Sequence, residues 1–203
     1  FRKLSPEHFV DRTWRIDSKT KRVANVVVAL EPIRNRQDPK CKLPAGDREV
    51  RRPESVTVDV PHLNYVPHVA VLSADQRLVV RNSSSVGLGF YLSVDPLVNP
   101  RGFASMLAPG QTFEIPLFPQ QQPIIITDPF RPWMKGHVWI FDHPYFALTQ
   151  EDGRFSFPQA PAGHEIRIWA WHEAKGKFYT KDIVLNAGEN AVEMMIQADK
   201  KTP

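Results

Sequence analysis

The feature that most limits how this chain can fold is a regular succession of short apolar runs, each ended by proline, glycine or a small polar cluster. The 203 residues include 19 prolines and 10 glycines. Short alternating runs bounded by turn residues are typical of β-strands, and they argue against a helical bundle. The sequence therefore predicts an all-β protein in which antiparallel strands form a Greek-key sandwich.

The predicted strands follow one another at short intervals from residue 23 onward. They are residues 23–30, 55–60, 68–73, 77–82, 87–94, 112–117, 123–127, 137–141, 146–149, 154–157, 165–172, 178–185 and 191–196. Ser5 followed by Pro6 predicts the start of one short helix. Residues 31–53 are polar and broken by prolines, so we expect a long excursion there, of a length that is usually functional or disordered.

The net charge of +4 is unevenly distributed along the chain. Residues 1–54 carry an excess of six basic residues, and the remainder carries an excess of two acidic ones. Such a basic arm can bind an acidic protein or a membrane surface. The candidate interaction residues are Arg2, Lys3, Arg12 and Arg15, together with Cys41. As the only cysteine, Cys41 excludes an internal disulfide and an iron–sulfur cluster but leaves a bond to another chain open.

Several function classes find no support in the sequence. It has no Gly-x-Ser-x-Gly, no phosphate-binding glycine loop and no His-Glu-x-x-His, so we do not expect an enzyme. The basic residues are not interleaved with aromatic ones, which argues against nucleic-acid binding. The longest apolar run, residues 26–30, is far shorter than the roughly 20 residues that span a bilayer. The chain begins at Phe1 rather than Met, so we expect a processed or trimmed start.

The histidines and tryptophans each allow a structural and a functional interpretation. None of the seven histidines forms a tight ligand pair in the sequence. We expect Asp142 with His143, and His172 with Glu173, to form hydrogen-bonded structural pairs. Trp169 and Trp171 share one face of a predicted strand, where they can belong to the core or form a stacking platform for a sugar.

The stretch from Asp128 to Phe146 is the most informative part of the chain. Residues 128–134 have the composition of a loop held by two prolines, and the alternating residues 137–141 follow it as a strand. A loop fixed between strands is the usual place for binding residues on a rigid scaffold. We therefore expect the functional character of the protein to depend on residues 128–134.

The order of several short motifs resembles the bacterial cupredoxin-like proteins of the methylamine-utilisation type, over roughly residues 23–175. The matching motifs are Asn25-Val26-Val27-Val28, Val66-Pro67-His68-Val69, Val80-Arg81-Asn82-Ser83, Leu107-Ala108-Pro109-Gly110-Gln111, Pro132-Trp133-Met134-Lys135-Gly136, Asp142-His143-Pro144-Tyr145-Phe146 and Trp171-His172-Glu173. Residues 149–163 also resemble the hairpin of carboxypeptidase-regulatory or transthyretin-like modules. The resemblance implies a periplasmic or secreted sandwich that carries one copper ion for electron transfer.

The resemblance also implies four copper ligands, and this chain departs from that pattern. A cupredoxin site uses two imidazoles, a thiolate and a weak thioether. The corresponding positions here are Leu88 or its neighbour Gly89, Asp128, Arg131 and Met134. A guanidinium keeps its proton and cannot bind a metal, and no thiolate is present at these positions. One interpretation is that an ancestral site has decayed into ordinary packing.

A sharper hypothesis is that a charge-assisted hydrogen bond between Asp128 and Arg131 holds the loop in place of copper. If the pair is partly exposed, it contributes no more than about 1 kcal/mol.

These observations predict a copper-free cupredoxin-like structural or interaction subunit without a cofactor. We expect its partners to be other protein subunits of a larger extracytoplasmic or membrane-associated complex, such as one for electron transfer. The expected parts are a basic arm at 1–22, a cupredoxin-like sandwich at 23–141 with the excursion at 31–53, and a transthyretin-like β extension at 142–203 packed on the same body. The alternatives are a copper-binding electron-transfer protein with non-standard ligands, such as histidines with Met134, and a carbohydrate-binding module.

Overall fold

The computed structural model describes residues 13–33, 43, 52–99, 103–157, 160–163 and 165–196. Within these residues the protein has twelve β-strands and no helix, so the predicted all-β class is confirmed. Among the described residues, no helix has the length and apolarity needed to cross a membrane. The predicted helix start at Ser5, the candidate residues Arg2, Lys3, Arg12 and Cys41, and most of the excursion lie outside the described residues.

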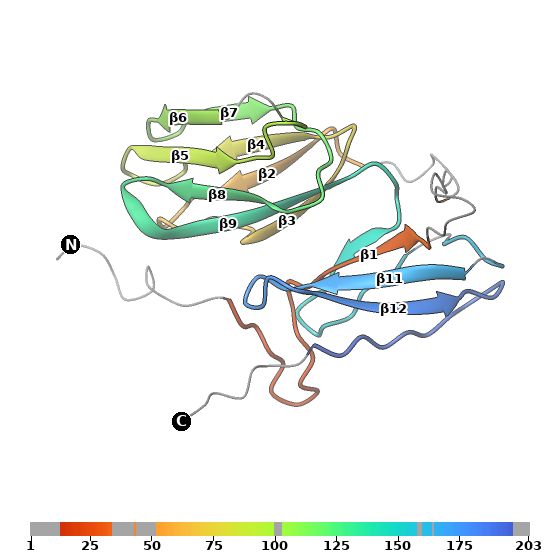
Figure 1. Ribbon diagram of the computed structural model, residues 1–203. Coiled ribbons are helices and arrows are strands. Elements are labelled where there is room, and N and C mark those ends of the chain that lie inside the picture. The colour runs from red at the N-terminus through yellow and green to blue at the C-terminus, as the bar shows by residue number, and fades with distance from the viewer. Residues whose placement is uncertain are drawn as a thin grey trace. The chain divides into compact units, whose positions relative to one another are not determined.

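The strands form two compact units that alternate along the chain. The described residues between 48 and 144 belong to the first unit. Those between 16 and 47, together with those after 144, belong to the second. The chain therefore contributes to the second unit before and after it builds the first, as the colours in Figure 1 show.

The first unit contains two sheets with a shared apolar core. Its strands are β2 (Ser55–Asp59), β3 (Val69–Ser73), β4 (Arg77–Arg81), β5 (Leu88–Ser93), β6 (Phe103–Leu107), β7 (Thr112–Ile115), β8 (Ile124–Asp128) and β9 (Arg131–Phe141). One sheet has the order β2-β4-β7 and the other the order β3-β9-β8-β5-β6. The core side chains alternate along the strands, as with Leu88, Phe90 and Leu92 on β5, because successive residues of a strand point to opposite faces.

Pairing within the first unit differs from the predicted antiparallel pattern in two places. β2 pairs with β4 in parallel, and β3 pairs with β9 in parallel, whereas the remaining pairs in the two sheets are antiparallel. The sequence analysis also missed β6 (Phe103–Leu107). Among the described residues this strand pairs with β5 alone, at the edge of its sheet. Its sequence lacks a marked apolar alternation, because Ser105 lies at a partly buried position and Met106 at an exposed one.

The second unit is a four-stranded antiparallel sheet with its own core. Its strands β1 (Val27–Pro32), β10 (Phe146–Leu148), β11 (Glu165–Trp171) and β12 (Phe178–Val184) follow the order β10-β1-β11-β12. Figure 1 shows β1, β11 and β12 side by side. The sequence-based division had grouped the first strand with the cupredoxin-like part, but in the structure β1 pairs with β10 and β11.

Two predicted strands of this unit have no ladder partner in the structure. Residues 154–157 and 191–196 are not assigned to strands. Side chains from both segments nevertheless pack against the core of the second unit, among them Phe155, Phe157, Val192 and Met194. Their apolar alternation therefore reflects burial of one side of an extended segment, which the sequence cannot distinguish from strand pairing.

Candidate functional site

The predicted loop at residues 128–134 is a tight β-hairpin with a bulge. Asp128 at the end of β8 pairs with Arg131 at the start of β9, and only Pro129 and Phe130 lie between them. The next pair is Thr127 with Lys135, so residues 132–134 form an insertion on β9. Bulges of this kind redirect side chains and tolerate proline, which cannot donate to a ladder. The prediction of a loop over residues 128–134 was therefore wrong. Only Pro129 and Phe130 lie in the turn, and Pro132 lies in the bulge on β9.

A buried ion pair closes this hairpin. The Arg131 Nη1 atom lies 2.5 Å from the Asp128 Oδ2 atom, and the side chain of Asp128 is 0% exposed whereas that of Arg131 is 21% exposed. The other carboxylate oxygen, Oδ1, accepts a hydrogen bond from the Phe130 amide at 2.8 Å. Arg131 also donates from Nη2 to the Gly87 carbonyl at 3.1 Å. The hydrogen bond predicted between Asp128 and Arg131 is present, with the carboxylate fully buried and the guanidinium partly exposed.

The neighbouring strand β5 is shaped to accept this ion pair. A Cβ atom at Gly89 would lie 3.0 Å from the Cδ2 atom of Phe130 and 3.3 Å from the Asp128 Oδ1 atom. Because glycine has no Cβ, the aromatic ring and the carboxylate can approach the backbone of β5 closely. Leu88 and Met134 are both buried in the core of the first unit. Of the four positions implied by the resemblance, Leu88 and Met134 are thus core residues, and Asp128 and Arg131 form an ion pair.

Tyr65 is a member of this region that the sequence analysis did not identify. Its side chain is buried, and its hydroxyl has no hydrogen-bond partner among the described residues. Burial raises the pKa of this hydroxyl, the negative charge of Asp128 raises it further, and the positive charge of Arg131 opposes the rise. Tyr65 lies in a stretch of the sequence without periodicity, so no signal there indicates that it would be buried near charged groups.

These residues do not fit a copper ion. Asp128 accepts hydrogen bonds at both of its oxygens, from Arg131 and from Phe130, and the guanidinium places a positive charge where a cation would have to bind. Leu88 has no donor atom, and a lone thioether at Met134 is the weak axial ligand of a cupredoxin site. The hairpin therefore has no donor set for blue-copper chemistry.

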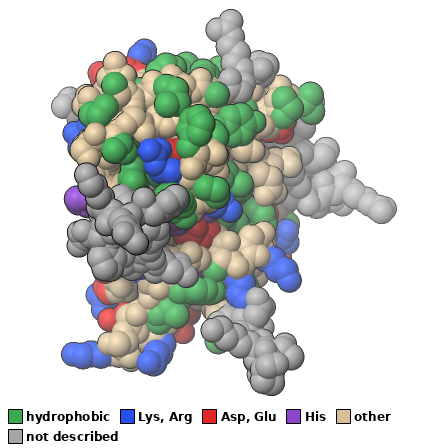
Figure 2. Space-filling view, turned by 90° about the vertical axis from the view of Figure 1, so that its left-hand side faces the viewer, with side chains coloured by type: hydrophobic (Ala, Val, Ile, Leu, Met, Phe, Trp, Pro, Cys, Tyr) green, Lys and Arg blue, Asp and Glu red, His purple; other side chains and the backbone are tan. Residues whose placement is uncertain are grey.

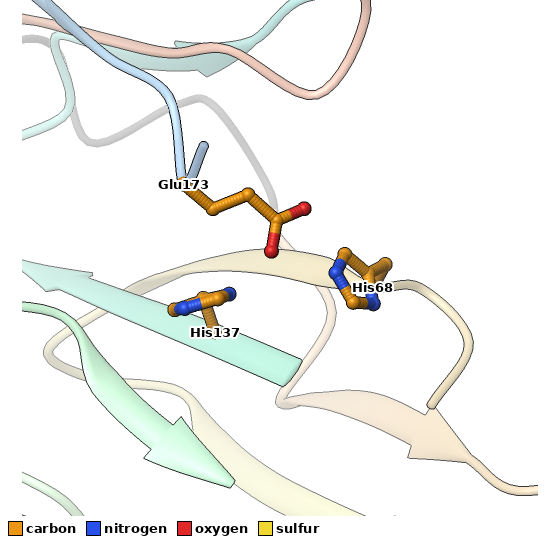
Figure 3. A group of neighbouring side chains, drawn as sticks. All are labelled: His68, His137 and Glu173. Carbon is orange, nitrogen blue, oxygen red and sulfur yellow. The ribbon is translucent and has the colours of Figure 1, made fainter. Parts of the chain in front are cut away.

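A second polar group in the first unit brings together two histidines that the sequence analysis treated separately. His68 directly precedes β3, and His137 lies on the adjacent strand β9. Their ring centroids are 6.0 Å apart with an interplanar angle of 76°, and a ring nitrogen of one lies within 4.8 Å of a ring nitrogen of the other. Figure 3 shows both side chains. The sequence, in which no histidines form a tight ligand pair, gave no indication of this pairing.

The remaining candidate polar residues lie elsewhere in the two units. Asp142 is exposed and His143 is partly buried. Burial lowers the pKa of His143, the charge of Asp142 raises it, and that of Arg52 lowers it. In the second unit, His172 is buried and its Nδ1 atom accepts a hydrogen bond from the Ala174 amide at 3.3 Å.

The side chains of Glu173 and Arg15, two further candidate residues, differ in solvent exposure. Glu173, also labelled in Figure 3, follows β11 in the second unit and is partly buried. Arg15 is exposed.

The tryptophans of β11 do not offer an exposed stacking platform. Both Trp169 and Trp171 are buried, and the ring of Trp169 packs edge-on against that of Phe178 with the centroids 5.3 Å apart. A sugar-binding platform needs ring faces open to solvent, and these two side chains lack them. The two side chains are buried on the face of β11 opposite to the core residues Ile168 and Ala170, and the carbohydrate-binding alternative loses its principal support.

Comparison with known proteins identifies likeness of fold only. No protein-family model matches the sequence, and no curated protein sequence matches it. Among solved structures, a purple cupredoxin from Nitrosopumilus maritimus is 19% identical, over 42% of this chain and 99% of that chain, with a TM-score of 0.35. A reduced amicyanin mutant is 14% identical, over 49% of this chain and 97% of that chain, with a TM-score of 0.39.

A third match is the copper-containing nitrite reductase of Thermus scotoductus. It is 18% identical, over 49% of this chain and 25% of that chain, with a TM-score of 0.37. These neighbours are cupredoxins or contain copper, but their TM-scores lie below 0.5 and they match less than half of this chain. These matches therefore support no conclusion about the function of this protein. The transthyretin-like character of residues 149–163 stays a prediction.

Proposed function

We propose that this protein is a cupredoxin-like subunit, copper-free at the hairpin, that acts by binding another protein and is not an enzyme. The observation that carries this proposal is the buried ion pair between Asp128 and Arg131. It occupies two of the positions at which the sequence resemblance implies metal ligands. A scaffold whose hairpin is closed by an ion pair can present a surface, but it lacks the thiolate that cupredoxin electron transfer needs.

The ion pair supports a rigid hairpin without a metal. Arg131 connects β9 to Asp128 on β8 and to the Gly87 carbonyl at the start of β5. Three segments are thus joined by one guanidinium, whose fixed geometry favours such multiple contacts. In a metal site the ion would provide this connection between strands. The charged side chains supply it here, so the turn at Pro129 and Phe130 keeps its position.

An apolar surface next to this hairpin supports protein binding. Phe130 is 70% exposed and Met106 is 61% exposed. Met106 pairs with Gly89 across β5 and β6, and Phe130 lies against the same glycine, so the two side chains are neighbours. Figure 2 views the side on which β8 turns into β9, and hydrophobic side chains gather in its upper part. We call Phe130 and Met106 the hairpin surface. Exposed apolar groups on a rigid element are typical of binding sites.

The location and the partner class rest on the sequence. The resemblance to cupredoxin-like proteins of the methylamine-utilisation type favours a site outside the cytoplasm. The basic excess in residues 1–54 favours a partner with an acidic surface, since opposite potentials promote association. We therefore propose an accessory role on a larger extracytoplasmic complex, such as a membrane-associated complex for electron transfer.

The absence of copper at the hairpin is tested with metal titration. Protein purified without a metal-binding tag is incubated with copper, separated by gel filtration and subjected to elemental analysis, alongside the variant Met134→Leu. We expect the copper content of the variant to equal that of the wild type, because Met134 is not a ligand. Copper that is bound by the wild type and lost in Met134→Leu would contradict the proposal.

Binding through the hairpin surface is tested with retained complexes. The purified protein is immobilised and exposed to extracts of its source under mild conditions, as are Phe130→Asp and Met106→Asp. Leu97→Asp is the matched control, because Leu97 is also exposed but follows the opposite end of β5. We expect a partner retained by the wild type and the control and lost by the other two. A partner retained equally by all four proteins would exclude this surface.

A further inference from the structure

We propose that His68 and His137 form a binding site for a divalent transition-metal ion on the sheet of the first unit. The site is distinct from the four positions that the sequence resemblance implies, none of which is a histidine. Its two imidazoles come from residues 69 positions apart in the sequence, which the parallel pairing of β3 with β9 brings together. Neutral imidazole is the ligand type that zinc, copper and nickel prefer.

The backbone fixes the spacing of the two histidines before any ion binds. The His137 amide donates a hydrogen bond to the His68 carbonyl at 2.9 Å. Gly136 precedes His137, and a Cβ atom there would lie 3.4 Å from the same carbonyl oxygen and 3.1 Å from the Cβ atom of Tyr65. Glycine thus permits the close approach of the segment around His68 to β9. A pair held by strand hydrogen bonds loses little freedom on binding, which favours affinity.

The ring positions are compatible with shared coordination after small rotations. Two nitrogens bound to one zinc ion at about 2.0–2.1 Å with tetrahedral angles lie about 3.3 Å apart. In the structure, ring nitrogens of His68 and His137 lie within 4.8 Å of one another. We infer that rotation of the rings about their side-chain bonds supplies any remaining approach while the pairing of β3 with β9 is kept.

The different exposure of the two side chains suits an accessible site. His137 is buried, whereas His68 is only partly buried, so an ion can reach the pair from the side of His68. Two imidazoles fill two coordination positions, and water or a further donor fills the others, as in open zinc sites. The Irving–Williams order then predicts tighter binding of Cu²⁺ than of Ni²⁺ or Zn²⁺.

The test is titration of the full chain with ZnCl₂ and then CuCl₂ by calorimetry, in a buffer that does not bind metals. We expect one ion per chain, and a rise in melting temperature on saturation because the ion binds the folded state. His68→Gln and His137→Gln each weaken binding by about tenfold or more, since even residues that only support metal ligands reach that effect. His62→Gln removes an exposed histidine of the same unit as the matched control, and it leaves the affinity unchanged.

The possible results distinguish binding at the histidine pair from binding at the hairpin. Because His137 is buried, its variant could unfold, so the partly exposed His68→Gln decides the question and circular dichroism verifies its fold. No saturable binding, or equal affinity in wild type and His68→Gln, overturns the proposal. Binding that persists in both histidine variants but is lost in Met134→Leu places the ion at the hairpin. That result would overturn the proposed copper-free function as well.

Discussion

Substitution of Arg131 by methionine tests whether the ion pair holds the hairpin. The variant keeps most of the side-chain length but removes the charge and both of its hydrogen-bonded contacts, to Asp128 and to the Gly87 carbonyl. The carboxylate of Asp128, which is 0% exposed, would be left with the Phe130 amide as the hydrogen-bond donor described for it. Arg131→Met therefore creates a buried charge without its counter-ion.

The expected loss of stability follows from this burial. Removal of one partner of a buried ion pair costs about 3–5 kcal/mol, because the remaining charge is uncompensated. Arg131 is 21% exposed, so water can enter in its place, and we expect a value near the lower end, about 3 kcal/mol. For a unit of about 100 residues, each kcal/mol lowers the melting temperature by about 4–8 °C. The unit containing the hairpin should therefore melt at least about 12 °C lower.

An exposed ion pair of the same unit provides the matched control. Arg77 and Glu114 are 2.7 Å apart with side chains 65% and 49% exposed, and such pairs contribute about 0–1 kcal/mol. Arg77→Met should therefore cost much less than Arg131→Met. The double variant Asp128→Asn with Arg131→Met should recover part of the loss, since it contains no buried charge. Together with the single variant Asp128→Asn, these proteins complete a double-mutant cycle that isolates the coupling between the two side chains.

The measurement is urea unfolding combined with amide hydrogen exchange at the hairpin. Hydrogen exchange is needed because the chain has two units, and a single unfolding curve does not assign a change to one of them. We expect faster exchange at residues of β8 and β9 in Arg131→Met and unchanged exchange in β11. If Arg131→Met costs no more than Arg77→Met, the ion pair does not stabilise the hairpin and the reasoning fails.

Three further substitutions test other features of the two units. Tyr65→Phe removes a buried hydroxyl that lacks a partner among the described residues, so it should raise the free energy of unfolding by about 1 kcal/mol. A lower free energy of unfolding in urea titration would contradict this and show that the hydroxyl has a hydrogen-bond partner. The folded-state pKa of His143 lies below 6.5, chiefly through burial, so its stabilising contribution is complete above pH 6.5 and is lost as the pH falls. His143→Gln should flatten the decline in melting temperature below pH 6.5, and an unchanged slope would refute this. Gly153 has φ +71°, and a Cβ atom added there would lie 2.9 Å from the Val23 nitrogen, whereas one added at Gly110, with φ +81°, meets no atom within 4 Å. Gly153→Ala should therefore lower the melting temperature more than Gly110→Ala. Equal losses would refute the steric argument.

The ion pair shows how far the sequence predicted the candidate site. Asp128 and Arg131 are three residues apart, so their contact was predictable once the resemblance had drawn attention to these positions. Their burial was not predictable, because it depends on Gly89 in β5 and on Gly87 just before it. The pairing of His68 with His137 was equally hidden, since no local pattern connects residues so far apart. Tyr65 was missed because its burial arises from contacts beyond its own segment.

By itself, the sequence determined that this protein is built from short β-strands with turns between them. The alternation of Val56 and Val58 with polar residues on β2, and the many prolines and glycines, are local properties that act before any strand meets another. The tertiary structure alone decided that β1 joins the second unit, that β3 runs parallel to β9 and that residues 191–196 pack without a ladder. The physical reason is that strands pair through backbone N–H and C=O groups that are the same in nearly every residue. The choice of neighbour is made by the packing of side chains from distant segments.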